Sequence, residues 1–551
     1  MLTATLASLA SASTRALARA GGGGASARAL STSAGTRLPP DAGGIDGALL
    51  ARLADPGLLP HTASWIGGAA VPAPTTYEVA DPATGSPLAR MARAGAPDTE
   101  AAIAAAGAAF PAWRDRPARD RAAVLGRWAA SIEAAAPDLA VILSAEAGKT
   151  LAEARSELAS SAAAVAWAAG EAVRVAGAVL PAADGSKRAL TLRAPVGVAG
   201  AITPWNFPAS MVTRKCAPAL AAGCTVVLKP AELTPLSAVA LVELARRAGL
   251  PAGALNLVSG DAPAIGDALL ASPVVRKLGF TGSTAVGRLL YAGCAPTVKR
   301  LSLELGGNAA VVVCADADLD AAAAAIAASA YRNAGQTCIS ASRVLVAAPV
   351  ADALADALAA RAGRVRVGRG ADPGVTMGPL ISPAAVARVA GHVSDAVARG
   401  ATSLVDPGPT LARLGAAGAP TAAGHWAPPA VLAGVPPEAA IFCEETFGPV
   451  LALTPFYSLE EALALANASE AGLASYVFTR DLATAWKAAE GLECGMVGVN
   501  EVGITADNLP FGGVKASGLG REGGVEGVAE FLEVKTVVMG VGYGRGGGNL
   551  G

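Results

Sequence analysis

The sequence predicts an α/β protein made of two successive domains, each built on a largely parallel sheet. Short runs rich in Val, Ile and Leu alternate with longer Ala-rich runs, as expected for strands that alternate with helices. This alternation occurs twice along the chain. The chain has 551 residues, of which 53% are hydrophobic and 16% charged, so it is long enough for two or three packed domains.

The periodicity places the elements in order. In the first half, helices are expected at residues 98–112, 117–146, 150–177, 209–222, 235–249, 263–271 and 284–293, and strands at 196–202, 225–229, 254–258 and 277–281. In the second half, helices are expected at 318–332, 349–362, 383–399 and 459–467, and strands at 309–313, 343–347, 450–456 and 496–500. Because helices separate the strands, both sheets are expected to be parallel.

The two ends of the chain differ from this pattern. The first 40 residues are rich in Ala and Ser and contain four arginines but no acidic residue. This composition favours a transit peptide over residues 1–30, with cleavage near Ser31, and a mitochondrial matrix location rather than a plastid. The alternative is an Ala- and Gly-rich tail without a targeting role. Residues 541–551 are mostly glycine and are expected to form a flexible tail.

Charge and composition limit the partners. The formal net charge is −1 and neither sign forms long runs, so neither nucleic acid nor an anionic membrane surface is an expected partner. The longest apolar stretch, residues 194–213, contains three prolines and is not expected to be a lipid-facing helix. The expected ligand is therefore a small molecule.

The histidines and cysteines narrow the chemistry further. His61, His392 and His425 lie far apart, so neither a His-based triad nor a metal site is predicted. The seven cysteines include no Cys-x-x-Cys pair, and their odd number favours reduced thiols. Six of them are interpreted mainly as small buried hydrophobic residues: Cys216, Cys224, Cys294, Cys314, Cys443 and Cys494.

Cys338 has a functional context. It ends the run Asn-Ala-Gly-Gln-Thr-Cys, and 34 positions earlier Glu304 begins the run Glu-Leu-Gly-Gly. A thiolate attacks carbonyl carbon, and a carboxylate with space around it can activate water to hydrolyse the resulting thioester. The pair indicates an aldehyde-oxidising enzyme. A cysteine hydrolase or thioesterase is the alternative, but no histidine lies near Cys338 in the sequence.

Asn206 lies in the run Thr-Pro-Trp-Asn-Phe-Pro, where an expected strand leads into a helix that carries Arg214 and Lys215. Its amide could donate to the oxyanion that forms when a thiolate adds to a carbonyl. As an alternative, Asn206 is only a turn residue in a loop bounded by prolines.

Two further runs of residues suggest that the protein binds a nucleotide. Lys229 and Glu232 follow a buried strand, at the end where α/β folds bind nucleotides, and could hold ribose hydroxyls. A glutamate there would repel a 2′-phosphate, which favours NAD, with NADP less favoured. Residues 280–287 follow another strand and open a helix whose amides could face a pyrophosphate. Taken singly, these runs also fit a solvated ion pair and an ordinary helix cap.

These runs together resemble the motifs of the aldehyde dehydrogenase superfamily, in family order. The resemblance covers about residues 60–540 and includes two further motifs, at residues 444–449 and 510–513. It implies an aldehyde-dehydrogenase-like fold and assembly as a homodimer or homotetramer. The implied parts are a Rossmann-like coenzyme domain (60–180 and 194–303), a catalytic domain (304–503) and a small β oligomerisation arm (181–193 and 530–540).

The resemblance also implies roles for individual residues. Cys338 would be the nucleophile and Glu304 the general base, while Asn206 and the Cys338 amide would form the oxyanion hole. Lys215 would be a proton-relay or structural residue. The implied cofactor-binding residues are Trp205, Lys229, Glu232, Gly282, Ser283, Gly287, Glu445 and Phe447. Because Glu304 is present, a free acid is the expected product, not an acyl-coenzyme A.

Within the superfamily, the motifs resemble succinate-semialdehyde dehydrogenases of GABA degradation most closely. Arg214 and Arg332 match the two arginines that bind the substrate carboxylate there, and Thr505 lies near a family serine that contacts the same group. The alternatives are a preference for glutarate semialdehyde or uncharged aldehydes, and a nucleotide-binding relative without turnover. The loop at residues 500–505 departs from the family pattern, and Ser340 replaces a second cysteine, so no local disulfide switch is expected.

Overall fold

The computed structural model describes residues 44–416 and 424–542. The predicted transit peptide lies outside the described residues, as does most of the predicted C-terminal tail. The first sheet has eight strands in the order β2-β1-β9-β8-β7-β10-β11-β21. The strands span Ala69–Val71 (β2), Ser64–Ile66 (β1), Leu255–Leu257 (β9), Thr225–Lys229 (β8), Val198–Ile202 (β7), Val275–Thr281 (β10), Arg300–Glu304 (β11) and Gly518–Leu519 (β21).

The five middle strands of this sheet, β9 to β11 in the sheet order, are parallel, and short antiparallel strands close both edges. Helices cover both faces, because successive strand residues point to opposite sides. In β8, Val226 and Leu228 belong to one buried cluster and Val227 to another. The first cluster involves α4 (Ala118–Ala134), α5 (Ala136–Ala147), α6 (Leu151–Ala172), α7 (Ser210–Ala222) and α8 (Leu236–Arg247), and the second α3 (Ala96–Arg114), α9 (Ala262–Ala271) and α10 (Thr284–Cys294).

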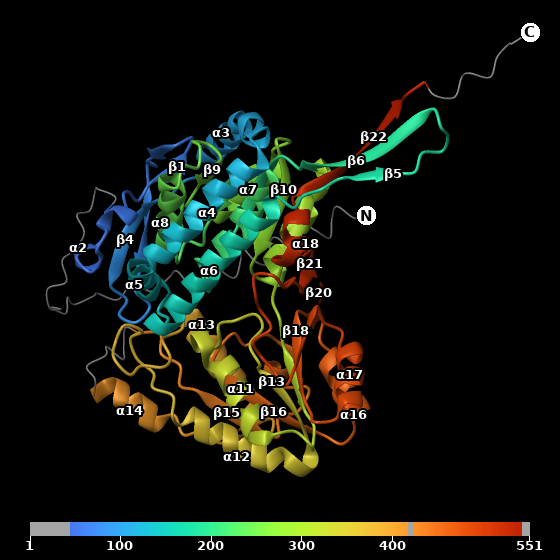
Figure 1. The fold of residues 1–551 in the computed structure, drawn as a ribbon. Coiled ribbons are helices and arrows are strands. Elements are labelled where there is room, and N and C mark those ends of the chain that lie inside the picture. Colours follow the sequence, from blue (N-terminus) through green and yellow to red (C-terminus); the bar gives the residue numbers. More distant parts are fainter. Residues whose placement is uncertain (1–43, 417–423, 543–551) are drawn as a thin grey trace, which may run out of the picture. The chain divides into compact units, whose positions relative to one another are not determined.

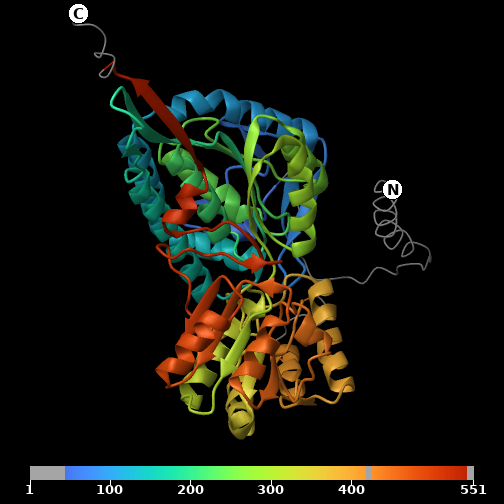
Figure 2. The same ribbon diagram turned by 90° about the vertical axis from the view of Figure 1, so that its right-hand side faces the viewer.

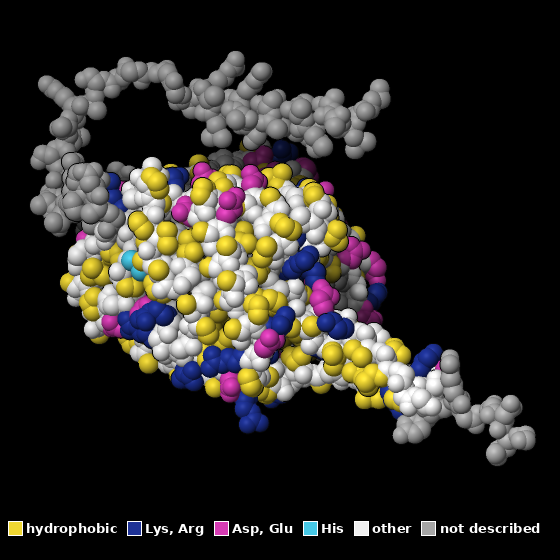
Figure 3. All heavy atoms as spheres, turned by 90° about the horizontal axis from the view of Figure 1, so that it is seen from above, with side chains coloured by type: hydrophobic (Ala, Val, Ile, Leu, Met, Phe, Trp, Pro, Cys, Tyr) yellow, Lys and Arg dark blue, Asp and Glu magenta, His cyan; other side chains and the backbone are white. Residues whose placement is uncertain are grey.

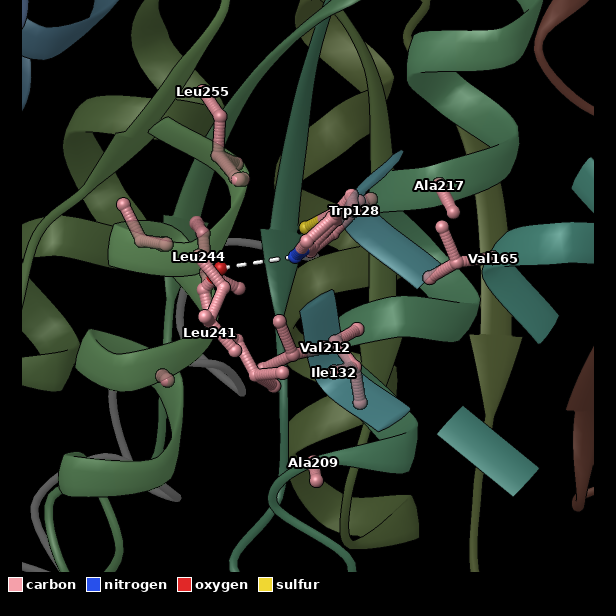
Figure 4. Packing of buried hydrophobic residues seen from close by; sticks show 14 of the residues in the cluster. Trp128, Ile132, Val165, Ala209, Val212, Ala217, Leu241, Leu244 and Leu255 are labelled. Carbon is pink, nitrogen blue, oxygen red and sulfur yellow. Dashed lines mark hydrogen bonds between the residues drawn. The ribbon is translucent and has the colours of Figure 1, made fainter. Parts of the chain in front are cut away.

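Trp128 of α4 shows how the larger cluster is packed (Figure 4). Its indole N–H donates to the carbonyl oxygen of Leu241 in α8 over 3.0 Å, while the ring lies among apolar side chains from several helices. The ring therefore leaves water without losing a hydrogen bond, and burial of this kind contributes roughly 1.5–3 kcal/mol per large side chain. This packing fixes α6 and α7, which carry several residues of the site described below.

The second sheet has seven strands in the order β14-β15-β16-β13-β12-β18-β19, of which only the edge strand β14 is antiparallel. They span Thr402–Ser403 (β14), Ala430–Ala433 (β15), Val450–Phe456 (β16), Arg343–Ala347 (β13), Ala310–Val313 (β12), Ala474–Phe478 (β18) and Met496–Val499 (β19). Its helices are α11 (Leu319–Tyr331), α12 (Ala351–Ala362), α13 (Pro383–Ala398), α14 (Gly408–Ala416), α15 (Ala440–Cys443), α16 (Leu459–Asn467) and α17 (Leu482–Gly491). Figure 2 shows the two sheets in separate parts of the molecule.

A third, three-stranded antiparallel sheet extends away from the helices (Figure 1). It consists of β22 (Leu532–Gly540), β6 (Lys187–Pro195) and β5 (Ala178–Leu180), and β22 pairs with β6 along its whole length. Several apolar side chains of this sheet are exposed, including Val179 at 85%. Hydrophobic side chains are visible along this projection in Figure 3. Exposed apolar strands of this length are typical of a surface that another chain covers.

The remaining described elements are short. They are α2 (Gly47–Leu50), the hairpin of β3 (Thr76–Ala80) and β4 (Pro87–Ala92), the pair of β17 (Ala471–Gly472) and β20 (Val514–Lys515), and α18 (Gly524–Ala529). Among the described residues, no single helix is long and apolar enough to cross a membrane; α4 and α5, bent by 72°, meet that test only as a pair and only by length and composition.

The structure confirms the α/β class and most of the predicted elements, with corrections. The helix predicted over 117–146 is two helices, because Pro137 lies in the first turn of α5 and cannot donate to the preceding turn. The helix predicted over 150–177 ends at Ala172. The elements that were not predicted include strands β11, β15 and β18 and helix α17, although β18 is buried throughout. Cys443 is exposed, contrary to the prediction of mainly buried cysteines, whereas Cys216, Cys224 and Cys294 are buried.

Candidate active site

The predicted site residues of the first sheet lie at one edge of it. Lys229 ends β8 and Glu304 ends β11, while Asn206 and Gly282 follow β7 and β10 within a few residues. These strands are parallel, so their carboxyl ends meet at the same edge. That edge is where ligands bind in open α/β sheets.

The loop between α11 and β13 carries Cys338. Three consecutive residues, Asn333, Ala334 and Gly335, have positive φ angles of 52°, 54° and 73°. Two of them are not glycine, so this is a strained turn that the surrounding contacts must hold. At Gly335 a side chain is also excluded, because a Cβ there would lie 2.1 Å from the carbonyl oxygen of Gly448. The turn reverses the chain after α11 and places Cys338 in the wall of a cavity.

Asn206 is hydrogen-bonded to the loop that carries Cys338. Its side-chain amide donates to the carbonyl oxygen of Gln336 over 2.9 Å, and its own carbonyl oxygen accepts from the Asn333 amide over 3.0 Å. Asn206 is buried. The structure therefore brings the predicted oxyanion donor and the predicted nucleophile loop together, from positions 130 residues apart.

Two carboxylates of α6 hold both loops, and sequence reasoning missed them. Glu153 accepts from the backbone N–H of Asn333 over 2.7 Å, at the strained turn. Glu157 accepts from the backbone N–H groups of Ala209 and Ser210, at the start of α7, over 2.9 and 3.1 Å. The sequence feature that could have revealed them is their spacing of four residues, which places both on one face of a helix.

Lys149 completes this arrangement. Its ammonium group is paired with Glu157 over 2.5 Å and donates to the carbonyl oxygen of Asn206 over 2.8 Å. It also lies 4.3 Å from the centre of the Phe207 ring. Both members of the ion pair have side chains only 1% exposed, so the pair is screened little by solvent. Lys149 was also missed by sequence reasoning.

The cavity beside Cys338 has a volume of 380 Å³ and is called the active-site cavity below. Arg214, Arg332 and Thr505, the three residues predicted to bind substrate, all line it. Each arginine lies over a phenylalanine ring of the cavity wall, Arg332 over Phe207 and Arg214 over Phe511, both at 5.1 Å from the ring centre. These contacts orient two guanidinium groups at the cavity that contains the thiol.

Acidic groups also line this cavity. Glu153 and Glu157 line it, and their oxygens accept hydrogen bonds from other groups of the protein. Asp507 contributes a further, half-buried carboxylate. Asp507 was not singled out from the sequence. It lies two residues after Thr505, just beyond the loop that departs from the family pattern, and it partly offsets the positive charge of the arginines.

Burial keeps the Cys338 thiol protonated in this structure. It raises the pKa of the thiol to about 12, and the nearby carboxylates of Glu445 and Glu304 act in the same direction, while Arg332 lowers it. A thiolate here therefore needs a change of environment or a base, because a neutral thiol is a weak nucleophile.

Glu304 is not part of the wall of the active-site cavity. Glu304 is only 2% exposed, and its carboxyl group has no hydrogen-bond partner among the described residues; one of its oxygens lies 2.9 Å from where a Cβ of Gly512 would be. Burial, and then the charge of Glu522, raises the pKa of Glu304 well above its ordinary value, while the charge of Lys215 opposes this. A buried carboxyl with a raised pKa is typical of an acid–base group.

Lys215 forms a buried ion pair with Glu522 beside Glu304. The three groups Glu304, Lys215 and Glu522 come from β11, α7 and the segment before α18. Glu522 is a further residue without a predicted role. In the sequence, Glu522 lies shortly after the family motif at residues 510–513.

Glu445 and Phe447 lie close to the Glu304 loop. Glu445 accepts from the backbone N–H of Gly307 over 2.9 Å, and burial raises the pKa of its carboxyl group to about 7. Phe447 has a positive φ of 53°, and its ring meets the Trp205 ring edge-on, with centres 5.5 Å apart. The structure thus groups three of the predicted cofactor residues from distant parts of the chain.

The other predicted cofactor residues lie along the sheet edge. Lys229 is buried and paired with the partly exposed Glu232 over 2.7 Å. Ser283 caps α10 by accepting from the N–H of Val286, and Gly282 precedes it. Gly287 packs against Leu305, where a Cβ would lie 2.4 Å from a side-chain carbon, so its position favours close helix packing over direct contact with phosphate.

The described residues contain no group of three or more His, Cys, Asp and Glu side chains arranged to bind a metal ion. Two buried hydroxyl groups without partners, those of Thr203 and Thr281, lie at the ends of β7 and β10. With Lys229, Glu232 and the first turn of α10, they supply polar groups along the edge where a dinucleotide would lie. The residues present therefore fit such a cofactor.

Comparison with known proteins identifies the family. The model of the aldehyde dehydrogenase family matches residues 70–537. The chain is 48% identical to 3-sulfolactaldehyde dehydrogenase of Pseudomonas putida, over 89% of this chain and 99% of the relative. It is 47% identical to glutarate-semialdehyde dehydrogenase of P. putida strain KT2440 (85% and 95%) and 45% identical to mitochondrial succinate-semialdehyde dehydrogenase of Oryza sativa subsp. japonica (90% and 92%).

A solved structure agrees with these relatives. The crystal structure of succinate-semialdehyde dehydrogenase from Burkholderia pseudomallei is 50% identical, with a TM-score of 0.85, covering 89% of this chain and all of that one. The protein belongs to the aldehyde dehydrogenase family and is an enzyme of that family. Members of this family act on aldehydes with NAD or NADP and are generally oligomeric. The names of the relatives differ in substrate, so they leave the particular aldehyde open.

Proposed function

We propose that the protein oxidises succinate semialdehyde to succinate with NAD as the electron acceptor, as in GABA degradation. The observation that carries the proposal is the pair of guanidinium groups, Arg214 and Arg332, fixed over aromatic rings in the same 380 Å³ cavity as Cys338. Two arginine forks suit a carboxylate at the end of the substrate opposite the aldehyde. Thr505 supplies a hydroxyl at the same cavity.

The nucleophile and the oxyanion donor act first. The Cys338 sulfur adds to the aldehyde carbon and forms a thiohemiacetal. The negative oxygen that develops is stabilised by the Asn206 amide and the Cys338 backbone N–H. Asn206 Nδ2 carries two hydrogens, and the bond to the Gln336 carbonyl uses only one of them, so the second remains for the substrate oxygen.

A nicotinamide cofactor, when bound, accepts the hydride that leaves the substrate carbon. Lys229 and Glu232 would hold the adenosine ribose, and Gly282 and Ser283 would lie at the pyrophosphate, with Glu445 at the nicotinamide ribose. Phe447 and Trp205 would contact the nicotinamide ring. Glu232 is 38% exposed at the sheet edge, and its charge disfavours a 2′-phosphate, which supports NAD over NADP.

Glu304 acts in the second half of the reaction. After hydride loss, a thioester joins Cys338 to the substrate, and water activated by Glu304 hydrolyses it to the free acid and the thiol. Glu304 is buried outside the active-site cavity wall, so its side chain must turn toward the thioester to act. The Lys215–Glu522 pair beside it offers a route by which its proton leaves.

The same proposal assigns roles to the remaining parts of the chain. Residues 60–180 and 194–303 would form the coenzyme domain, and 304–503 the catalytic domain. The sheet of β22, β6 and β5, with its exposed apolar residues, would be the oligomerisation arm of a homodimer or homotetramer. Residues 1–30 would direct the protein to the mitochondrial matrix, which the name of the Oryza sativa relative supports.

Glutarate semialdehyde is the second candidate substrate. It carries the same two functional groups with one more methylene, and a relative that is 47% identical is named for it. Only the length of the cavity can discriminate between the two aldehydes. One methylene changes the binding free energy in a pocket by only about 1–3 kcal/mol. A non-catalytic role is disfavoured because Cys338, Asn206 and Glu304 are all present.

The test is kcat/KM for succinate semialdehyde, glutarate semialdehyde and butyraldehyde, each with NAD and with NADP, using the chain from Ser31 onward. The proposal predicts the highest value for succinate semialdehyde with NAD. An equal value for butyraldehyde would show that the arginines do not select a carboxylate. A higher value for glutarate semialdehyde would assign the enzyme to the longer substrate.

A further inference from the structure

A second cavity lies next to the active-site cavity, on the side of α11 and α12, which pack side by side. It has a volume of 430 Å³ and is called the α11–α12 cavity below. Glu153 and Arg332 line both cavities. The other lining residues have no part in the proposed reaction: Ala324, Ala327, Ala328, Tyr331, Arg361, Arg364, Val365 and Thr376.

The charge of the α11–α12 cavity is positive. Three arginines line it, and within residues 44–416 and 424–542 none of them has a carboxylate within 4.0 Å. Glu153 is the acidic side chain among the lining residues, and its two oxygens are bonded to Asn333 and Thr150. The cavity therefore has two positive charges in excess, and these are available to a ligand.

Among the residues that the structure describes, two buried donors at this cavity have no acceptor. The Tyr331 hydroxyl is without a partner although the residue is only 7% exposed, and the Arg361 Nε–H is likewise buried and unpaired. Arg361 is held in place because its Nη2 donates to the carbonyl oxygen of Asp320 over 3.1 Å. Burial raises the pKa of Tyr331, so its hydroxyl remains a donor at neutral pH. Leaving such buried donors unpaired is unfavourable, and a ligand that supplies acceptor atoms would remove this cost.

Thr376 adds a third donor. Its hydroxyl oxygen accepts from the backbone N–H of Arg366 over 2.9 Å, so its hydrogen is free to point elsewhere. The cavity wall thus combines guanidinium, phenol and alcohol donors with Ala and Val side chains, and it offers almost no acceptor. This is the chemistry of a site for a small molecule with several negative oxygens.

We propose that the α11–α12 cavity binds a small dianion, either a phosphate or a dicarboxylate, through Arg361, Arg364 and the Tyr331 hydroxyl. Arg332 lies between the two cavities. An anion in the second cavity attracts its side chain and weakens its hold on the substrate carboxylate. This second part rests on the proposed function, because it requires Arg332 to bind the substrate.

The binding site is tested by calorimetric titration of the full chain with inorganic phosphate at constant ionic strength. Malonate is the dicarboxylate arm and chloride the control for ionic strength. The variants are Arg361→Gln with Arg364→Gln, and Tyr331→Phe. Arg366→Gln is the control for loss of a positive charge from the same segment, because Arg366 is exposed and does not line the cavity.

Saturable binding is expected, at least about 10-fold weaker in the double arginine variant, or about 1.4 kcal/mol. Tyr331→Phe should weaken it severalfold, and Arg366→Gln should leave it unchanged. Tighter binding of malonate than of phosphate would identify the ligand class as dicarboxylates. No saturable binding, or equal affinity in the wild type and in both the double variant and Tyr331→Phe, would overturn the site.

The coupling is tested by kinetics. Phosphate should raise the KM for succinate semialdehyde severalfold in the wild type, with kcat unchanged, and should have no such effect in the double arginine variant. An unchanged KM at a phosphate concentration that saturates the site would overturn the coupling. Failure of the proposed function would give a different result. The wild type would still bind phosphate, but Arg332→Ala would leave the preference for succinate semialdehyde intact.

Discussion

The side-chain amide of Asn206 donates to the carbonyl oxygen of Gln336 over 2.9 Å, two residues before Cys338. This bond joins the loop after a strand of the first sheet to the turn that carries Cys338, from the second sheet. The proposed oxyanion donor and the proposed nucleophile are therefore held together before any substrate enters, and such preorganisation is a main source of catalytic rate.

Replacing Cys338 should separate chemistry from cofactor binding. In Cys338→Ala, oxidation of every aldehyde should disappear, because no other thiol lines the active-site cavity in the described part of the chain. NAD affinity, measured by fluorescence or calorimetry, should stay within about threefold, since the proposed cofactor contacts lie on other residues. Residual turnover comparable to the wild type would show that the nucleophile has been misassigned.

Glu304→Gln should slow thioester hydrolysis more than hydride transfer. Single-turnover kinetics separates the two steps, because NADH appears in a burst while acid release lags. In the wild type, hydrolysis should become faster as pH rises, since the pKa of Glu304 is raised and only its deprotonated form acts as a base. That pH dependence should be absent in the variant. An equal loss of both steps would contradict the assignment.

The buried pair of Lys149 and Glu157 should matter for stability and for catalysis. Lys149→Met leaves the Glu157 charge without its partner, which should destabilise the fold by about 3–5 kcal/mol in denaturant unfolding. It also removes one of the two hydrogen bonds that the Asn206 carbonyl oxygen accepts, so kcat should fall while KM changes little.

The double variant Lys149→Met with Glu157→Gln is the control for this prediction. It should recover much of the stability, because no unpaired charge remains, but not the catalytic rate. Full recovery of kcat would mean that the pair serves stability alone.

Asp507→Asn should improve binding of an anionic substrate. Its carboxylate lines the active-site cavity and repels the substrate carboxylate. Removing that charge should lower the KM for succinate semialdehyde about two- to fivefold, with the value for butyraldehyde unchanged. The same change for both aldehydes would indicate a general reshaping of the loop around Thr505 instead.

The sequence predicted those features that local patterns encode. The alternation of β-rich and Ala-rich runs located most helices and the central strands of both sheets. The short motifs identified Asn206 and Glu304, which lie at one edge of the first sheet, and Cys338, whose loop is hydrogen-bonded to Asn206. The sequence around the Asn206 motif also indicated Arg214, and that around the Cys338 motif indicated Arg332. Both arginines line the active-site cavity. These features are visible because each depends on residues that are neighbours in the chain.

What sequence reasoning missed depends on contacts between distant segments. Glu153 and Glu157 look like ordinary surface charges of a helix, and only the fold shows that they cap a strained turn and the start of α7. Lys149 and Glu522 become significant only through buried ion pairs with partners far along the chain or on another element. The break between α4 and α5 was also missed because an Ala-rich helical pattern outweighed a single proline.

We propose that Arg332 selects aldehydes that carry a carboxylate, and one ratio of kcat/KM values tests this proposal. The measurement is kcat/KM for succinate semialdehyde divided by kcat/KM for butyraldehyde, in the wild type, in Arg332→Ala and in Arg155→Ala. Arg155 is an exposed arginine of α6 that lines neither cavity and controls for loss of charge.

Loss of a charged hydrogen bond is worth roughly 1.5–3 kcal/mol, so the ratio should fall about 10- to 100-fold in Arg332→Ala. It should not change in Arg155→Ala. A ratio that is the same in all three proteins would contradict the claim and leave a general aldehyde dehydrogenase in which Arg332 is structural.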